Sequence, residues 1–402
     1  MVRKIILLLL IFGSSFVIAS ALPQFSLLSG NKCQNCHINT QGSGLRSDLG
    51  WYSFNEQSLI KPESIGLGWL YGENNSGNTL LEDNILTLGT DMRLQYARSH
   101  STENAERKLF PMQTAVYASI RATKWAQFEG GINIGHRRFG NTQTSNFRGQ
   151  QPWSISMILQ PTLSYPQLRV GFFSPTIGMR NDDHTKLIWQ VPSASGTNNI
   201  SNLIPPLYAE FGTELTYDAL KWLTVSVGAF GSHSISELVL NKYSTGNIGS
   251  QISLISDANK PTIVARAVVW QRFFDDKLNA YLGSSVFTND DFILMNAFAG
   301  VGLADKVTLM FDYAASDKKG IRKTTTASVE AMYQLHEALF LTARAETGRT
   351  LTENFDSAYT QAVMIGAQIF VLPYVELRPE YRIMDANSFR SGRYALQLHL
   401  FY

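Results

Sequence analysis

Five consecutive residues, Cys33-Gln34-Asn35-Cys36-His37, carry the chemistry that is easiest to recognise in this chain. Cys-x-x-Cys-His is the attachment motif of a c-type haem. Its two thiols bind the porphyrin covalently, and the histidine that follows reaches the iron as the proximal axial ligand. The motif therefore predicts a single haem c, bound through Cys33 and Cys36, with His37 as a ligand of the haem iron.

The same two thiols have other uses in exported proteins, because a Cys-x-x-Cys pair can form a disulfide or a redox dithiol. The chain contains only these two cysteines. The histidine directly after the second cysteine favours haem, and the sequence lacks the alternating strand and helix pattern of a thioredoxin-like domain. A zinc site would need further Cys or His residues nearby, and the next histidine is His100. Haem is therefore the expected cofactor.

Residues 1–21 have the three parts of a secretory signal peptide. Arg3 and Lys4 form the positive start, an apolar stretch covers 5–12, and an A-x-A cleavage signal ends at Ala21. The apolar stretch is too short for a transmembrane helix, which needs about 20 residues, although an N-terminal membrane anchor is the alternative. We expect an exported protein whose mature chain begins after about Ala21.

The chain has no strong charge imbalance. It carries 34 Lys and Arg residues against 32 Asp and Glu residues, and removal of the leader with its two cations leaves no net charge. Nucleic acid is bound mainly through an excess of basic residues. A nucleic-acid partner is therefore not expected.

Residues 22–79, which contain the haem motif, form a first unit that is too small to enclose a haem by itself. A segment of this length rarely builds a sufficient apolar core, while haem is a large apolar group that must be covered. The stretch 68–79 is rich in Gly and Asn, which is typical of a linker. We expect this unit to act as a plug inside the rest of the molecule.

Residues 80–402 alternate apolar and polar side chains in segments of about 9–13 residues, which is the pattern of membrane β-strands. The mature chain has no run of about 18 apolar residues, so helical membrane spans are excluded. The predicted fold class is all-β, an antiparallel transmembrane barrel of about 16 strands. The expected strands cover 86–98, 111–121, 125–137, 153–164, 166–174, 206–217, 222–231, 261–273, 278–287, 291–303, 306–316, 323–334, 338–347, 358–370, 373–384 and 392–402.

The last strand shows the alternation most clearly. Leu396, Leu398 and Leu400 point to one face, which is expected to contact lipid. Gln397 and His399 point to the other face, which is expected to line the lumen. The chain also ends on aromatic residues, which resembles the C-terminal signal of bacterial outer-membrane proteins. An outer-membrane location is therefore expected, and a soluble all-β protein is disfavoured because the outward faces are uniformly apolar.

Every second connection between the expected strands is short, and most of the others are long and polar, as in barrels with periplasmic turns and extracellular loops. Both ends of the barrel then lie on the periplasmic side, so the haem unit would enter the lumen from the periplasm. Aromatic residues near the short turns are expected to form a girdle at the membrane interface. They are Trp125, Tyr165, Trp222, Tyr333, Tyr374 and Tyr402.

The sequence does not fix the second axial ligand of the haem iron. His399 is the candidate for this distal position, because it lies on the lumen face of the last strand near its periplasmic end. Met310 and Met332 also point inward near that end, and Met179 and His184 lie in a long loop that could fold inward. His ligation generally gives a lower reduction potential than Met ligation.

Two acidic groups in the expected loops are of a type that binds cations. They are Asp182-Asp183-His184 and Asp290-Asp291. Carboxylate and imidazole suit a cation such as Fe(II). Solvated loop charge is the simpler interpretation of both groups.

The order of these features resembles that of a known family. The haem motif and a following stretch with Leu45-x-x-x-Leu49-Gly50 come after the leader, and a barrel then extends to the C-terminus. This layout resembles the fused monohaem cytochrome–porins of the bacterial outer membrane, whose best-known members are the iron oxidases of iron-oxidising bacteria. The resemblance covers the whole chain in architecture and about 25–54 in specific residues.

This resemblance implies electron transfer across the outer membrane. An extracellular donor such as Fe(II) would reduce the haem, and a periplasmic c-type cytochrome or other electron carrier would take the electron onward, as in an Fe(II):cytochrome c oxidoreductase. Only Cys33, Cys36 and His37 carry over residue by residue. Two other functions stay open at this point: a solute porin with a haem-bearing plug, and a peroxidase-like haem enzyme, which needs an open distal site.

Overall fold

The fold is that of a computed structural model of the 402-residue chain. The leader expected at 1–21 lies outside the described residues, as does most of the linker expected at 68–79, so both stay predictions, together with the boundary between the two units. The structure describes residues 23–38, 44–47, 50, 57–68, 85–99, 107–133, 153–162, 164–179, 186, 190–191, 201–202, 208–236, 239–241, 251–274, 277–352, 358–386 and 389–401.

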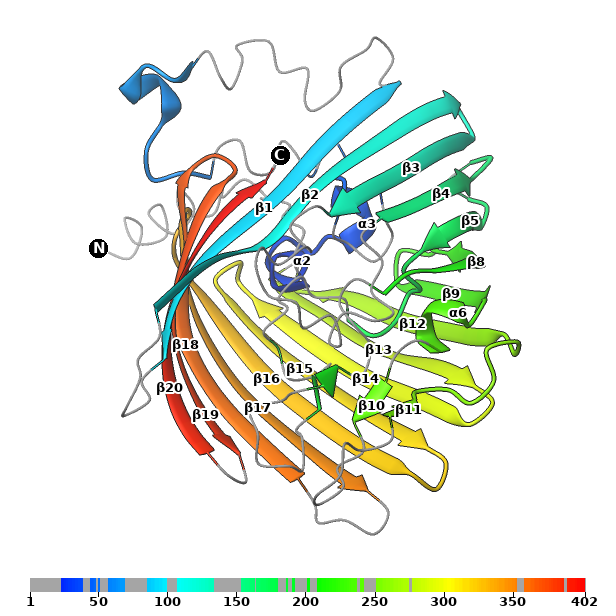
Figure 1. Ribbon diagram of the computed structural model, residues 1–402. Helices are drawn as coiled ribbons and strands as arrows, with labels where there is room; N and C mark the ends of the chain where they lie inside the picture. The colour runs from blue at the N-terminus through cyan, green and yellow to red at the C-terminus, as the bar shows by residue number, and fades with distance from the viewer. Residues whose placement is uncertain are drawn as a thin grey trace.

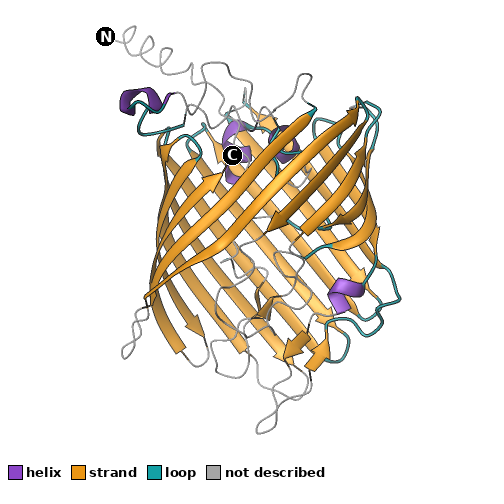
Figure 2. Ribbon diagram, turned by 45° about the horizontal axis from the view of Figure 1, so that its top comes forward, coloured by secondary structure: helices purple, strands orange, loops and turns teal. Residues whose placement is uncertain are grey.

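Sixteen strands form one closed antiparallel barrel, which confirms the predicted fold class (Figure 1). The ring closes where β1 (Leu86–Ser99) pairs with β20 (Phe389–Phe401), with Arg93 opposite His399. Figure 2 shows the strands running obliquely around a continuous wall. The other wall strands are β2 (Arg107–Thr123), β3 (Ala126–Asn133), β4 (Trp153–Leu159), β5 (Gln167–Phe173), β8 (Glu210–Tyr217), β9 (Leu223–Phe230), β12 (Thr262–Phe273), β13 (Leu278–Asn289), β14 (Phe292–Leu303), β15 (Val307–Lys318), β16 (Arg322–His336), β17 (Leu339–Thr352), β18 (Ala358–Leu372) and β19 (Val375–Ala386).

The two faces of the wall differ in polarity, as the alternation in the sequence predicts. In β15, for example, Leu309 and Phe311 are exposed on the outer face, whereas Thr308 and Asp312 are buried on the inner face. A closed ring leaves no strand edge with unpaired backbone groups, and an apolar outer belt is what lipid requires. The outer surface of this barrel is therefore suited to a bilayer.

The wall is taller on one side than on the other. The strands from β12 to β20, which we call the tall wall, contain 12 to 15 residues each. The strands β3, β4, β5, β8 and β9, which we call the low wall, contain only 7 or 8. A strand needs about 9–11 residues to cross a bilayer. The described parts of the low-wall strands are therefore shorter than a full membrane span.

The loops after β5 and after β9 contain elements that the sequence did not predict. They are the helix α6 (His233–Ser236) and the two-stranded pairs β6 (Gln190–Val191) with β7 (Ser201–Asn202) and β10 (Val239–Asn241) with β11 (Gln251–Ser253). The strand predicted at 153–164 was too long, because β4 ends at Leu159. Pro161 follows, and proline cannot donate a hydrogen bond to a sheet.

The N-terminal segment lies at the end of the barrel that carries the short turns. Its helices are α2 (Pro23–Ser29) and α3 (Cys33–Cys36), which lie within the ring of strands in Figure 1, and the 3-10 helix η1 (Pro62–Ile65). The helix α2 packs against β13, β14 and β15. Among the described residues, no helix has the length and hydropathy that a membrane crossing requires.

Candidate functional site

The helix α2 lies directly on the inner face of the tall wall. Gly300 and Gly302 occupy successive inward positions of β14, and a Cβ atom at Gly302 would collide with the carbonyl oxygen of Leu27. The Nδ2 group of Asn279 on β13 donates a hydrogen bond of 2.9 Å to the same carbonyl oxygen. Glycine is needed here because it lets another backbone approach the strand closely.

Another side of α2 carries Phe25, which packs among aromatic rings of the wall. Its ring centroid lies 5.0 Å from that of Phe340 and 6.2 Å from that of Phe370. Phe370 in turn lies 6.4 Å from Phe401 near the end of β20. These rings form one buried cluster together with Met332. Buried aromatic side chains dominate local packing energy, so Phe25 is the main apolar anchor of the N-terminal segment.

Lys32 ties the residue directly before the haem motif to the low wall. Its Nζ group lies 3.3 Å from the carbonyl oxygen of Asp218, 2.7 Å from that of Leu220 and 3.4 Å from that of Leu223. Burial lowers the pKa of Lys32, and the charge of Asp218 partly opposes this shift. The segment that precedes Cys33 is therefore held at the turn between β8 and β9.

The haem motif itself lies on one helical turn. Residues three apart share a side of a helix, so Cys33 and Cys36, which open and close α3, are expected on one face. The side chain of Cys33 is outside the described part of the structure, that of Cys36 is buried, and His37 is 5% exposed. A Cβ atom at Gly50 would collide with the carbonyl group of Cys36, so the backbone closes tightly around the motif.

A line of contacts runs from the motif to the last strand of the barrel. His37 forms an isolated antiparallel bridge with Arg46. The guanidinium carbon of Arg46 lies 4.4 Å from the ring centroid of Phe401, and this ring lies 4.8 Å from the imidazole ring of His399. The structure therefore brings the predicted distal candidate, His399, into the same part of the lumen as the motif.

Carboxylates hold the ring of His399 against the lumen wall. Its Nδ1 atom lies 2.8 Å from Oε2 of Glu376, and its Nε2 atom lies 3.3 Å from Oδ1 of Asp91. Asp91 also pairs with Arg93 at 2.8 Å. A carboxylate on one ring nitrogen is the usual orienting contact of a metal-binding histidine. Iron binding would require Nε2 to leave Asp91, so the distal role of His399 stays a prediction.

The methionines considered for the distal position lie close to α2. Met310 and Met332 are buried on the inner face, as their positions in the strands predict. Met179 is also buried, and its Sδ atom accepts a hydrogen bond of 2.7 Å from the hydroxyl of Tyr281. Met179 and Met310 share a buried cluster with Leu27. Their role at the iron stays a prediction, and His184 lies outside the described residues.

A cavity of about 520 Å³ opens between the motif segment, the turn that precedes β9, and the strands β12 and β13. Its lining includes Leu27, Lys32, Asn35, Lys221, Trp222, Trp270 and Arg272. The two indoles and Leu27 provide apolar walls, while Lys221 and Arg272 place positive charge at the exposed rim. Trp222, which the sequence predicted for the membrane girdle, lines this cavity. The acidic Asp218 also lines the cavity, so apolar walls and charges of both signs meet there.

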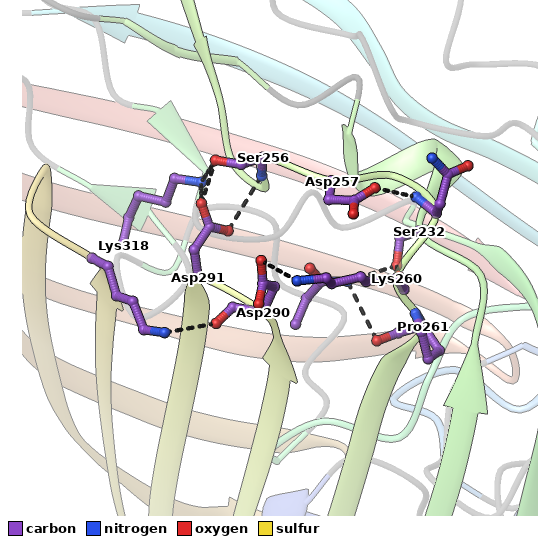
Figure 3. Close-up of polar contacts among 11 residues, drawn as sticks. Ser232, Ser256, Asp257, Lys260, Pro261, Asp290, Asp291 and Lys318 are labelled. Atoms are coloured by element: carbon purple, nitrogen blue, oxygen red, sulfur yellow. Dashed lines mark hydrogen bonds and ion pairs between the residues drawn. The ribbon is translucent and has the colours of Figure 1, made fainter.

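The acidic turn that the sequence offered as a cation site faces lysines (Figure 3). Asp290 pairs with Lys260 at 2.7 Å, and Asp291 pairs with Lys318. The other acidic group, at 182–184, lies outside the described residues. Within the described ranges, no three His, Cys, Asp or Glu side chains gather in a group that could hold a metal ion.

No known protein family matches the sequence, and no curated protein matches it either. Solved structures do match in three dimensions. OprB of Pseudomonas putida has a TM-score of 0.52 at 12% identity, over 87% of this chain and 100% of that protein. The outer membrane channel DcaP of Acinetobacter baumannii has a TM-score of 0.50 at 10% identity, over 81% of this chain and 99% of that protein.

The chain has the fold of an outer-membrane barrel. At these identities the likeness extends to the fold alone. The comparisons give no information about the haem motif. The chemistry of the site must therefore be argued from the residues of this chain.

The residues that seat the N-terminal segment were missed by sequence reasoning. No sequence pattern identifies Asn279, Lys32 or Arg46 as contact residues, because their partners are backbone carbonyls and aromatic rings far away in the chain. Gly300 and Gly302 did offer a signal: two glycines at successive inward positions of one strand indicate that another backbone approaches the sheet there. A search for such pairs would have pointed to the docking surface on β14.

Proposed function

We propose that this protein transfers electrons across the bacterial outer membrane through one haem c bound to Cys33 and Cys36, with His37 as the proximal iron ligand. The observation that carries the proposal is the seating of the motif segment inside one end of the barrel. A segment of this size cannot cover a haem alone. The contacts of α2 and Lys32 with the inner wall support enclosure of the cofactor by the barrel, so that the segment acts as a plug.

The described residues fit a haem at this place. Cys36 and His37 are buried, and the neighbouring cavity offers apolar walls such as Trp270 and positive charge from Arg272. When bound, the haem supplies one-electron redox chemistry. The residues of the chain would hold its attachment points, cover its apolar surface and keep water from most of it.

His399 is our proposal for the distal ligand, with Glu376 orienting its ring through Nδ1. Replacement His399→Ala is then expected to change the spin state of the haem in the visible spectrum. The neighbouring lumen substitution Gln397→Ala is the matched control and leaves the spectrum unchanged. An unchanged spectrum in both variants would remove His399 from the iron.

The proposed setting follows from the barrel and the expected leader. The chain is exported, its leader is cleaved after about Ala21, and the barrel contacts outer-membrane lipid through its apolar belt. The electron donor would be extracellular Fe(II) or another reductant, and the acceptor would be a periplasmic c-type cytochrome or another carrier. The end that holds the motif would face this acceptor.

A solute porin with a haem-bearing plug is the second candidate function. The fold favours it, because DcaP, a channel, has the same type of barrel. Many lumen-facing side chains are also polar, as in β16, where Thr326, Ser328 and Glu330 are buried on the inner face. The two candidates differ in what crosses the membrane: electrons in the first, solutes in the second.

The proposal is tested by the visible spectrum of the purified full-length protein, produced in a host that matures c-type cytochromes. Sharp bands of a reduced c-type haem are expected after dithionite, and also after anaerobic Fe(II). The double variant Cys33→Ser with Cys36→Ser is the control and should lack these bands. A wild-type protein without haem bands would overturn the proposal. Bands that respond to dithionite but not to Fe(II) would remove Fe(II) as the donor.

A further inference from the structure

A stretch of the loop after β5, residues 174–179, runs along the inside of the barrel, and we call it the strap. Its side chains Thr176, Ile177 and Met179 are buried. The strap begins directly after Phe173, the last residue of a low-wall strand. The chain therefore turns into the lumen at the level where the low wall ends.

Polar contacts fix the strap to inward-facing side chains of three strands. The amide of Thr176 donates a hydrogen bond of 2.9 Å to Glu214 on β8. The amide of Gly178 donates one of 2.8 Å to the hydroxyl of Ser285 on β13, and Arg266 on β12 donates one of 2.8 Å to the carbonyl of Gly178. The strap thus spans the inner face from β8 to β13.

The same loop continues to the opposite side of the barrel. Lys186 forms a buried ion pair with Glu330 on β16, and β5 and β16 lie almost opposite each other in the ring. On the way, Met179 packs in one cluster with Leu27 of the N-terminal helix. The described residues of this loop therefore contact both sides of the barrel, and Met179 meets the segment that enters from the other end.

Aliphatic side chains from two loops fill the space beside the strap. Ile177 from the strap is buried in one cluster with Ile235, Leu254 and Ile255 from the loop between β9 and β12. We call these four residues the loop core. They pack against inward-facing rings such as that of Phe287. In an open porin the lumen is polar and filled with water, whereas an apolar constriction of this kind excludes water and ions.

The loop that carries Leu254 and Ile255 is fastened to the barrel by the next residue (Figure 3). The amide of Ser256 donates a hydrogen bond of 3.2 Å to Oδ1 of Asp291 in the turn between β13 and β14. Lys318 pairs with Asp291 and donates a hydrogen bond of 2.9 Å to the hydroxyl of Ser256. The loop core is therefore held in place by polar contacts among Ser256, Asp291 and the buried Lys318.

We propose that the strap and the loop core seal the lumen against ions and solutes. The N-terminal segment occupies one end of the barrel and the loops occupy the next layer, so the two act as barriers in series. Opening one barrier leaves the path closed by the other. This inference does not rest on the haem, and it assigns to the barrel a conduction property opposite to that of an open porin.

The test measures ion conductance of the full-length protein in planar bilayers. Gly302→Leu displaces α2, because a side chain there collides with Leu27. Ile177→Asp with Leu254→Asp places two charges in the loop core and expels it. A third protein combines all three substitutions. Ala297→Leu, at an exposed outward position of the same strand β14, is the matched control for Gly302→Leu.

We expect no conductance from four of the proteins: wild type, the control Ala297→Leu, Gly302→Leu, and Ile177→Asp with Leu254→Asp. The variant that combines Gly302→Leu with the two loop substitutions is expected to conduct at least ten-fold more than wild type. Porin-like conductance from wild type or from Gly302→Leu alone would overturn the proposal, as would a folded combined variant that stays closed. If the combined variant does not fold, Glu214→Gln with Ser285→Ala removes one acceptor oxygen at Thr176 and the acceptor of the Gly178 amide without adding charge, while the hydrogen bond from Arg266 to Gly178 stays. Added to Gly302→Leu, this milder pair again compares a protein in which both barriers are disturbed with one in which only α2 is displaced.

Discussion

The tall wall and the low wall use different means to cover their inner faces. On the tall wall, neighbouring strands cover one another: Arg344 on β17 pairs with Glu346 at 3.2 Å and lies 3.7 Å from Glu330 on β16. On the low wall, partners also come from loops, as in the pairing of Glu214 with Thr176, beside strand-to-strand pairs such as that of Arg169 with Glu129. The strands β5, β8 and β9, whose two ends are both described, have 7 or 8 residues, fewer than the roughly 9–11 that cross a bilayer, so loops complete that side.

This difference shows which parts of the barrel depend on long-range packing. The apolar cluster beside the low wall joins strand ends such as Phe173 and Phe230 to loop residues such as Ile235 and Leu254. The cluster around α2 joins the tall wall to the N-terminal segment instead. Two inserts from opposite ends of the barrel thus fill one lumen, and each of them contacts both walls.

The largest expected effect comes from removing the aromatic anchor on the tall wall. Phe25→Ala deletes a buried ring that contacts Phe340 and Phe370, and such truncations cost about 3–5 kcal/mol. We expect the N-terminal segment to leave the lumen while the barrel stays folded, which limited proteolysis of that segment would detect. The control is Phe211→Ala, an exposed ring on the outer face of the low wall. Equal protease resistance in wild type and Phe25→Ala would contradict the docking of α2.

A smaller effect is expected from loosening the strap on the low wall. Glu214→Gln replaces one acceptor oxygen by an amide group that cannot accept from Thr176, and a lost buried hydrogen bond to a charged group costs about 1–3 kcal/mol. Hydrogen exchange at the Thr176 amide should become faster, with the tall wall unaffected. Thr213→Val, on the outer face of the same strand, should leave exchange unchanged. Unchanged protection in Glu214→Gln would mean that the loop is held by other contacts.

The smallest effect concerns pH and the cluster that fastens the loop core. Burial alone would raise the pKa of Asp291, but hydrogen bonds from Lys318 and Ser256 and the charge of Lys318 outweigh burial and lower it. A carboxylate with a lowered pKa in the folded state stabilises that state above its ordinary pKa of about 3.9, and this contribution is lost as the pH falls through the lowered value.

The protection factor of the Ser256 amide, which is its exchange rate compared with that of an unprotected amide at the same pH, should therefore fall below the ordinary pKa of an aspartate. Asp291→Asn should exchange faster at neutral pH and lose most of this dependence. Lys260, which pairs with Asp290 at the same turn, provides the control Lys260→Met, in which the acid response of Ser256 persists. A response that survives in Asp291→Asn would assign it to another group.

The two walls also differ in how far they could be predicted from the sequence. The tall-wall strands are long and alternate without interruption, so β13 was expected at 278–287 and covers Leu278–Asn289. On the low wall, β8 was expected from 206 and begins at Glu210. Tyr208 and Ala209 are buried just before it, because the loop packs inward there. Local alternation cannot reveal such packing, which depends on residues far away in the chain.

The candidate site, too, has a part that could be predicted from the sequence and a part that could not. The roles that we propose for Cys33, Cys36 and His37 are inferred from residue types and spacing alone, whereas the inward position of His399 was predicted from alternation and is confirmed by its burial. The seat of the motif segment could not be predicted, because it depends on the approach of Leu27 to Gly302 across hundreds of residues. A short motif can therefore be recognised in the sequence, whereas the surface against which the motif segment packs can be identified only from the folded structure.

The central claim is that electrons cross this barrel while ions and solutes do not. Liposomes that contain the full-length protein, an internal c-type cytochrome in its oxidised form and a trapped fluorescent dye would test both parts at once. After anaerobic addition of Fe(II) outside, the account predicts that the internal cytochrome becomes reduced while the dye is retained, and that Cys33→Ser with Cys36→Ser abolishes the reduction. No reduction in wild type, or reduction only together with dye leakage, would contradict it.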